Sequence, residues 1–263
     1  MPLVGVGTWR LNGDQLSRVL DQAIVIGYRS IDTAPYYGNE ATVGSAVRRS
    51  AERREDLFVT TKIRGTDQGR ESAVRGLEQS LHRLGLDYVD LLLIHWPLPM
   101  WDLYVSTWEA MIDLRSSGLV RVIGVSNFEP EHVDRVIHET GVVPAVNQIQ
   151  HNAAIPNAAM RAHNRRRRIH TQAWEPLGNR NGLLDHPVVR DAAAAIGRTP
   201  AQVLLRWNLE RGVSVMPKAS CLSHLEENLA LYSWSLPPDL LCALDGLSGD
   251  DANRVDPVTN LVE

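Results

Sequence analysis

The chain has little cysteine, little lysine and no long hydrophobic run. Its two cysteines, Cys221 and Cys242, cannot build a disulfide framework, which favours a reducing compartment. No apolar run approaches the ~20 residues that cross a bilayer, and no charged and then apolar leader opens the sequence. These absences predict a cytoplasmic protein without a membrane partner.

An excess of positive charge is also missing. The net charge is -4, which gives no general attraction to nucleic acid or to an anionic membrane. The one dense basic run, Arg165–Arg168, closes a helical stretch. We interpret it as a solvated helix C-terminus, where cations suit the helix dipole, rather than as a nucleic-acid patch. We therefore expect no nucleic-acid partner. Independently of the charge, we expect a monomer that acts on a small-molecule substrate.

Common metal and nucleotide motifs are absent. The sequence has no Walker loop, no HExxH pair and no CxxC pair, and we predict no metal site. The run Gly5–Arg10 begins like the glycine-rich dinucleotide loop of a doubly wound sheet. However, Arg10 stands where the last glycine belongs, and Trp9 would crowd a pyrophosphate, so we reject that match.

What the chain does contain is a regular alternation of short apolar runs and longer amphipathic stretches. Its 263 residues, 44% of them hydrophobic, suit one barrel domain, which is typically ~250 residues long. Eight runs have the residue types of buried strands: Leu3–Thr8, Tyr28–Thr33, Leu57–Ile63, Val89–Trp96, Val120–Asn127, Ala145–Gln150, Ile169–Trp174 and Val213–Lys218. We predict a (β/α)8 TIM barrel that forms a single domain over residues 1–263.

Three helical signals lie in the second half of the chain. Thr199 followed by Pro200 predicts a helix start with an N-cap and a proline at the first helical position. An extra helix is expected at Pro187–Ile196, between the last two strands, and a terminal helix at Pro238–Leu247.

Chemically capable side chains stand at the carboxyl ends of seven of the predicted strands: Asp32, Lys62, His95, Ser126, Asn127, Gln148, Trp174 and Lys218. Taken singly, each has an ordinary explanation, such as a core histidine or half of an ion pair. In a barrel, however, these ends converge on the one face where catalytic sites are built. The only two lysines among 27 basic residues are in this set, so each invites a role that a guanidinium cannot fill; chance is the alternative.

A series of motifs in the same order resembles the aldo-keto reductases. They are Gly27–Glu40, Val59–Lys62, Leu93–Pro97, Ile123–Phe128, Val146–Gln148, Ala173–Gly178 and Met216–Lys218, followed by Glu227 and Asn228. Within that family the chain is similar to the bacterial 2,5-diketo-D-gluconate reductases and their actinobacterial relatives. The resemblance implies an NADPH-dependent enzyme that reduces an aldehyde or ketone, dicarbonyls and keto-sugars included.

The resemblance implies a catalytic tetrad of Asp32, Tyr37, Lys62 and His95. A phenol is a reluctant acid near neutral pH, and an ammonium beside it stabilises the phenolate. Lysine offers a compact charge for this position, which Asp32 would hold in place. His95 can donate a second hydrogen bond to the carbonyl oxygen. The residues expected to form the substrate pocket are Trp9, Tyr36, Tyr37, His95 and Trp96.

The same resemblance implies the cofactor site. Ser126, Asn127 and Gln148 match the positions that hold the nicotinamide carboxamide, Trp174 the aromatic that stacks on the ring, and Lys218 the grip on the adenosine 2'-phosphate. The complete expected set is Gly7, Thr8, Trp9, Asp32, Ser126, Asn127, Gln148, Trp174, Glu175, Leu177, Gly178, Lys218, Ala219, Ser220, His224, Glu227 and Asn228.

Several positions depart from the family pattern. Only Met1 and Pro2 precede the first strand, so the usual hairpin plug is missing or truncated. Gln150, His151 and Asn152 replace a Glu-x-His-Pro run, and Glu175 replaces a small residue near the pyrophosphate, where a carboxylate weakens binding unless it points away. Ala219 stands where a serine usually follows the lysine, and His224 replaces an arginine that contacts the 2'-phosphate. We therefore expect weaker but measurable use of NADH.

Two further expectations concern function. The C-terminal tail, Ser248–Glu263, is short, which predicts an open pocket. The alternative to an enzyme is a cofactor-holding sensor or regulatory protein on the same scaffold with vestigial turnover, which the complete tetrad disfavours. A hydrolase or lyase barrel would need metal ligands or a carboxylate pair at the strand ends, and the sequence has neither.

Overall fold

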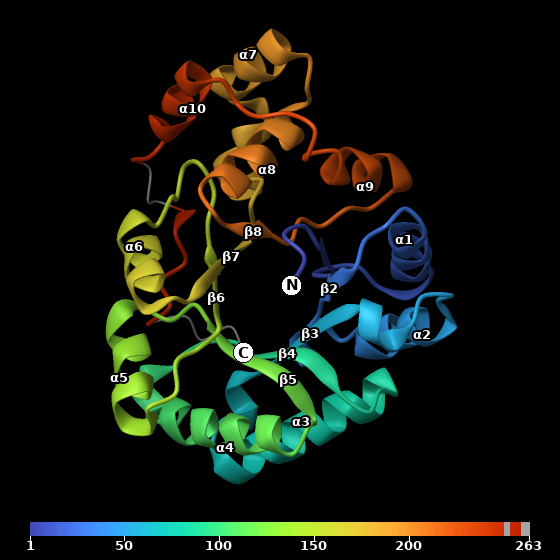
Figure 1. The fold of residues 1–263 in the computed structure, drawn as a ribbon, viewed down its shortest axis with the longest axis vertical. Coiled ribbons are helices and arrows are strands. Elements are labelled where there is room, and N and C mark those ends of the chain that lie inside the picture. Colours follow the sequence, from blue (N-terminus) through green and yellow to red (C-terminus); the bar gives the residue numbers. More distant parts are fainter. Residues whose placement is uncertain (250–252, 259–263) are drawn as a thin grey trace.

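The β-rich runs form one parallel sheet that is curled into a barrel (Figure 1). The structure is a computed structural model that describes residues 1–249 and 253–258. In these residues the sheet has eight strands in sequential order: β1 (Val6–Gly7), β2 (Ser30–Asp32), β3 (Phe58–Ile63), β4 (Val89–Ile94), β5 (Val120–Ser126), β6 (Val146–Gln150), β7 (His170–Trp174) and β8 (Ser214–Val215).

The ring closes between the first residues of the chain and β8. Val4 forms a parallel bridge with Val215, and the Gly5 amide donates to the Val215 carbonyl at 3.0 Å. This closure confirms the predicted (β/α)8 barrel.

Helices surround the sheet (Figure 1). They are α1 (Gly13–Val25), α2 (Glu40–Arg49), α3 (Arg70–Leu84), α4 (Tyr104–Ser116), α5 (Pro130–Thr140), α6 (Ala158–Arg167), α7 (Pro187–Ile196), α8 (Pro200–Glu210), α9 (Leu222–Leu229) and α10 (Pro238–Asp245). Thr199 caps α8 as predicted, because its hydroxyl accepts from the Gln202 amide while the Gln202 side chain accepts from the Thr199 amide. The arginine run does end a helix: α6 stops at Arg167, and the exposed Arg168 follows it.

The first and last strands are shorter than predicted. Pro217 has no N–H to continue the ladder, which limits β8. A Cβ on Gly7 would lie 2.7 Å from the Met216 carbonyl oxygen, and one on Gly5 would lie 2.5 Å from the Met216 Sδ. The glycines that imitate the start of a dinucleotide loop are therefore needed for close packing of β1 on the chain after β8.

Apolar side chains fill two main regions. The larger core lies between the strands and the helices, with Trp108 and Phe128 fully buried. A second cluster beneath α7, α8 and α10 is built around Trp207. No hairpin precedes β1 within the described residues; Met1 lies near the barrel axis (Figure 1), and its Sδ is 3.8 Å from Gln172 Nε2.

Candidate active site

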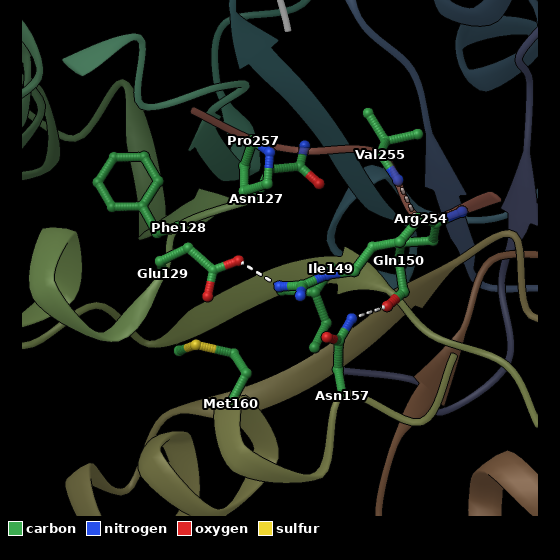
Figure 2. A pocket seen from close by; sticks show the side chains of 10 residues that line it. All are labelled: Asn127, Phe128, Glu129, Ile149, Gln150, Asn157, Met160, Arg254, Val255 and Pro257. Atoms are coloured by element: carbon green, nitrogen blue, oxygen red, sulfur yellow. Dashed lines mark hydrogen bonds and ion pairs between the residues drawn. The ribbon is translucent and has the colours of Figure 1, made fainter. Parts of the chain in front are cut away.

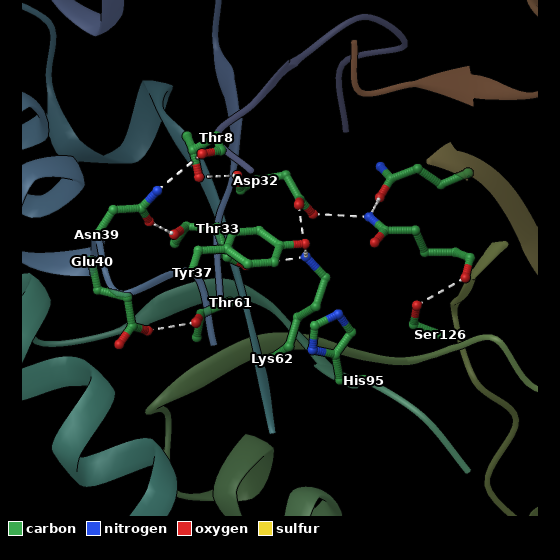
Figure 3. A network of polar contacts seen from close by, with 12 residues as sticks. Thr8, Asp32, Thr33, Tyr37, Asn39, Glu40, Thr61, Lys62, His95 and Ser126 are labelled. Carbon is green, nitrogen blue, oxygen red and sulfur yellow. Dashed lines mark hydrogen bonds and ion pairs between the residues drawn. The ribbon is translucent and has the colours of Figure 1, made fainter. Parts of the chain in front are cut away.

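The carboxyl ends of β2 and β3 join Asp32, Lys62 and Tyr37 in one polar network (Figure 3). The Lys62 Nζ donates to Asp32 Oδ1 at 2.7 Å, to the Thr33 carbonyl at 3.1 Å and to the Tyr37 hydroxyl at 3.1 Å. Three acceptors match the three hydrogens of an ammonium. The network therefore fixes both the charge of Lys62 and its direction.

Lys62 stays charged although its side chain is completely buried. Burial alone would lower the pKa of this ammonium, but the Asp32 carboxylate and the Tyr37 oxygen raise it further than burial lowers it. The net result is a Lys62 pKa above its ordinary value, so the amine is protonated throughout the neutral range.

The loop that carries Tyr37 is held by the residues after it. Asn39 Nδ2 donates to the carbonyls of Thr8 and Leu11, each at 2.9 Å, and Asn39 Oδ1 accepts from the Thr33 hydroxyl at 2.7 Å. These bonds join the 3₁₀ turn η1 (Pro35–Tyr37) to the loops that follow β1 and β2.

A buried carboxylate completes this support. Glu40 accepts from the Thr61 hydroxyl and from Arg83 Nε, both at 2.6 Å. Asn39 and Glu40 lie inside the Gly27–Glu40 motif, and neither was assigned a role from the sequence. Their signal was the occurrence of two polar residues after Tyr37 and Gly38.

Aromatic rings line the approach to the Tyr37 hydroxyl. Trp9 stacks on Tyr36 with 5.5 Å between ring centroids and packs against Tyr37 at 5.0 Å. His95 lies edge-on to Tyr37 at 6.0 Å and stacks on Trp96 at 6.3 Å. The five residues expected to form the substrate pocket are thus linked by a series of ring contacts.

The two neighbouring tyrosines have different surroundings. Tyr37 reaches Lys62, whereas Tyr36 is 38% exposed and packs on Trp9, itself 39% exposed. Of the two hydroxyls, only that of Tyr37 is bonded to the Lys62 ammonium.

The amides and hydroxyl at the ends of β5 and β6 form a second cluster beside the first. Ser126 Oγ donates to the Gln148 carbonyl at 2.9 Å, and Asn127 Nδ2 donates to Ser126 Oγ at 3.1 Å. The Trp174 indole donates to Asn127 Oδ1 at 2.7 Å, and Gln148 Nε2 donates to Asp32 Oδ2 at 2.8 Å. The expected carboxamide residues therefore lie together, and one of them, Gln148, contacts the ion pair directly.

Glu175 is bonded on both oxygens. Gln150 Nε2 donates to Glu175 Oε2 at 2.8 Å, and the Arg180 amide donates to Oε1 at 3.0 Å. The Glu175 backbone has φ 57°, in the left-handed region. The sequence could not show where the Glu175 carboxylate points; in the structure it points toward Gln150 and the Arg180 amide.

Gln150 also bonds to the described segment that contains Asn253 and Val255. Its Nε2 donates to the Asn253 carbonyl at 3.0 Å, and its Oε1 accepts from the Val255 amide at 2.8 Å. Arg254 forms an ion pair with Glu129 at 2.7 Å (Figure 2). A cavity of about 20 Å³ remains beneath this segment.

The described part of the tail therefore lies next to Asn127, one of the expected cofactor-binding residues, and does not leave the site fully open on that side. Residues 250–252 and 259–263 of the predicted tail lie outside the described residues.

The other two departures after β6 are structural. His151 is buried, stacks on Trp207 and bonds to Asn208 Oδ1 at 2.7 Å. Burial lowers the pKa of His151 to about 3, so the ring is neutral. Asn152 Oδ1 accepts from the amides of Ala154 and Ile155 and closes a turn.

The expected phosphate-binding residues lie on the loop between β8 and α9 and, for His224, in the first turn of α9. Lys218, Ser220 and His224 are exposed, whereas Ala219 is buried. In the part of the chain that the structure describes, Lys218 forms no hydrogen bond or ion pair. Farther along α9, Glu227 accepts from the Thr199 hydroxyl, and Asn228 is buried.

The remaining expected residues are Gly7, Thr8, Leu177 and Gly178. Thr8 Oγ1 donates to the Asp32 carbonyl at 2.9 Å. Gly178 has φ 58° and packs on Leu183. Over residues 1–249 and 253–258, no three His, Cys, Asp or Glu side chains are grouped to hold a metal ion, and no helix is long and apolar enough to cross a bilayer.

Known proteins resemble this chain over almost its whole length. A profile of the Aldo/keto reductase family matches residues 3–248. Methylglyoxal reductase DkgA of Salmonella typhimurium is 41% identical over 258 residues, which cover 98% of this chain and 92% of that protein. The 2,5-diketo-D-gluconic acid reductase B of a Corynebacterium species is 43% identical, covering 97% of this chain and 92% of that protein.

A solved structure agrees with these matches. The crystal structure of a Gox0644 variant in complex with NADPH has a TM-score of 0.94 and 38% identity, and the match covers 99% of this chain and 94% of that one. The barrel is thus shared with a solved structure, and this chain belongs to the aldo/keto reductase family.

Proposed function

We propose that this protein reduces an aldehyde or ketone, with NADPH as the hydride donor and Tyr37 as the general acid. The observation that carries the proposal is the contact of 3.1 Å between the Tyr37 hydroxyl and the Lys62 ammonium. Lys62 is itself buried and paired with Asp32, so its charge cannot be screened by water at this point.

Tyr37 supplies the proton. When a carbonyl accepts hydride, negative charge develops on its oxygen, and a positioned acid that protonates this oxygen accelerates the step ~10²–10⁴-fold. An adjacent ammonium favours the phenolate that Tyr37 leaves behind. Asp32 holds Lys62 against Tyr37 and balances the buried charge.

His95 assists from its edge-on position beside the tyrosine ring. Its ring is 6.0 Å from that of Tyr37, centroid to centroid, and its backbone carbonyl accepts from Asn127 Nδ2 at 3.0 Å. From this position the imidazole can donate a hydrogen bond to the substrate oxygen, which stabilises the developing charge.

The donors and acceptors beside Asp32 suit a nicotinamide. A carboxamide needs both a donor and an acceptor, and the Ser126 hydroxyl and the amides of Asn127 and Gln148 offer both within one cluster. The half-buried Trp174, fixed by Asn127, offers a flat apolar face. When bound, the cofactor supplies the hydride.

NADPH is preferred over NADH in this proposal because Lys218 provides an exposed cation for a 2'-phosphate. Gly7, Thr8, Trp9, Leu177 and Gly178 line the way from the carboxamide to the phosphates. On the β8–α9 loop and α9, Ala219, Ser220, His224, Glu227 and Asn228 surround the adenosine end. Glu175 is compatible with a pyrophosphate nearby because Gln150 and Arg180 hold its carboxylate.

The substrate lies against the aromatic wall of Trp9, Tyr36 and Trp96. The relatives named above act on methylglyoxal and on 2,5-diketo-D-gluconic acid by their names, so small dicarbonyls and keto-sugars are the first candidates.

The test is the loss of reduced-nicotinamide absorbance with methylglyoxal, 2,5-diketo-D-gluconate and simple aldehydes, each with NADPH and NADH. We expect turnover with at least one carbonyl and a higher kcat/KM with NADPH. Tight NADPH binding without turnover of any carbonyl would instead support a cofactor-holding sensor.

A further inference from the structure

A glutamine deep in the barrel continues the polar network beyond the proposed site. Gln172, on β7, is 1% exposed, and its Oε1 accepts from Gln148 Nε2 at 2.5 Å. The same Gln148 nitrogen donates to Asp32 Oδ2 at 2.8 Å. The Gln148 amide group therefore uses both of its hydrogens on residues of the protein.

The charge of Asp32 determines how the side-chain amides of Gln148 and Gln172 are oriented. Because Asp32 pairs with Lys62, it is a carboxylate and only accepts, so Gln148 must turn its nitrogen toward it. That nitrogen then requires an oxygen from Gln172, whose own nitrogen lies 3.8 Å from Met1 Sδ. A reversed Gln172 would put two amide nitrogens against each other.

With its nitrogen bonded to Asp32 and Gln172, the Gln148 side chain has one group left for a ligand, the oxygen Oε1. No described residue donates to Gln148 Oε1, and the Gln148 backbone carbonyl is already bonded to Ser126 and Asn127. Gln148 can therefore act toward a carboxamide only as an acceptor, from the carboxamide NH₂.

We propose that Gln172 is a positioning residue that acts through Gln148: it holds the Gln148 amide so that Oε1 faces the cofactor carboxamide and Nε2 stays on Asp32. The inference rests on the proposed function, because it assigns a further residue to the same cofactor site. It also links the orientation of the nicotinamide to the ion pair that supports Tyr37.

The test compares substitutions at Gln172 that keep or remove the acceptor. Gln172→Met has a similar length but no oxygen, and Gln172→Leu removes the oxygen with a different shape, in case the first variant does not fold. Gln172→Glu keeps an acceptor, since a carboxyl buried at this position, with only Gln148 between it and the Asp32 carboxylate, takes up a proton rather than carrying a second buried charge. Thr171→Val is the matched control, because Thr171 is a buried neighbour on β7 whose hydroxyl bonds to Asn164 at 3.0 Å, away from the site.

NADPH affinity, measured by quenching of tryptophan fluorescence, is the first readout. We expect Gln172→Met or Gln172→Leu to weaken it about 3–10-fold, the usual worth of one orienting hydrogen bond. Gln172→Glu should stay within about twofold of the wild type, on the same scale. Thr171→Val should lower the Tm without changing NADPH affinity.

A double-mutant cycle separates positioning from general damage. If Gln172 acts through Gln148, Gln172→Met should cause no further loss of NADPH affinity in a Gln148→Leu background. Additive losses, an unchanged affinity in the folded non-acceptor variant, or a loss in Gln172→Glu equal to that in Gln172→Met would each overturn the inference. Wild-type turnover is measured first: an inactive wild type overturns the proposed function and this inference with it, whereas an active wild type with an unaffected Gln172→Met overturns the inference alone.

Discussion

The only two lysines of the chain lie in opposite surroundings. Lys62 is buried and donates to three acceptors, whereas Lys218 is exposed and has no partner among the described residues. One end of the proposed site is thus held by contacts within the protein, whereas the other presents an exposed cation. We infer that catalysis depends on the exact position of the Lys62 ammonium, whereas NADPH binding at Lys218 depends mainly on the presence of a positive charge.

The largest effect should come from the acid itself. Tyr37→Phe should lower kcat by ~10²–10⁴-fold, the usual contribution of a general acid, while NADPH affinity changes little. Steady-state kinetics and fluorescence titration measure the two quantities. Tyr36→Phe is the matched control, and a larger loss in that variant than in Tyr37→Phe would mean that the wrong tyrosine has been assigned.

Exchanging each lysine for arginine tests the comparison directly. Lys62→Arg keeps the charge but replaces a compact ammonium by a planar fork, so kcat should fall by ~10² or more, as when a preorganised donor is lost. Lys218→Arg keeps an exposed cation for a phosphate and should change NADPH affinity less than about threefold. If both variants keep the wild-type circular dichroism and lose activity to a similar extent, the proposed difference between the two lysines is wrong.

A second cation near the exposed Lys218 should increase the contribution of charge to NADPH binding. His224→Arg places a permanent cation on the same surface as Lys218 and should tighten NADPH about 3–10-fold, which is the worth of a partly screened charge-assisted contact. NADH lacks the 2'-phosphate and serves as the control ligand. Equal tightening of both cofactors would show that His224 does not face the phosphate.

The smallest effect concerns the Glu175 carboxylate and its hydrogen bond to Gln150. Gln150→Leu removes the amide that holds Glu175, so the freed carboxylate should weaken NADPH binding about threefold. The double variant Gln150→Leu/Glu175→Ser should bind NADPH at least as tightly as the wild type. If the double variant binds as weakly as Gln150→Leu alone, the loss comes from the tail segment near Val255 rather than from Glu175.

Much of the barrel could be predicted from local sequence. Continuously apolar runs such as Val89–Ile94 identify strands that are buried on both faces, and Thr199 with Pro200 marks the start of α8. Strands β1 and β8 were predicted too long because their length depends on the approach of Gly7 to Met216, which are distant in sequence. The placement of the chemically capable residues at strand ends followed from the strand pattern alone.

The residues around the centre were harder to predict. Nothing local distinguishes Gln172 from any other buried polar residue of a strand, yet its oxygen meets the nitrogen of Gln148. Gln150 was noticed only as a departure, because its partners at Asn253 and Val255 lie about a hundred residues away. Such roles depend on hydrogen-bond geometry rather than on residue type.

The sequence by itself determined the strand–helix alternation, the ring of polar residues at the strand ends and the two lysine positions. It could do so because burial and turn chemistry act over a few residues. Only the tertiary structure decided where the Glu175 carboxylate points and how the amides of Gln148 and Gln172 are turned. Hydrogen bonds depend on distance and direction between groups far apart in the chain, and those are set only when the barrel closes.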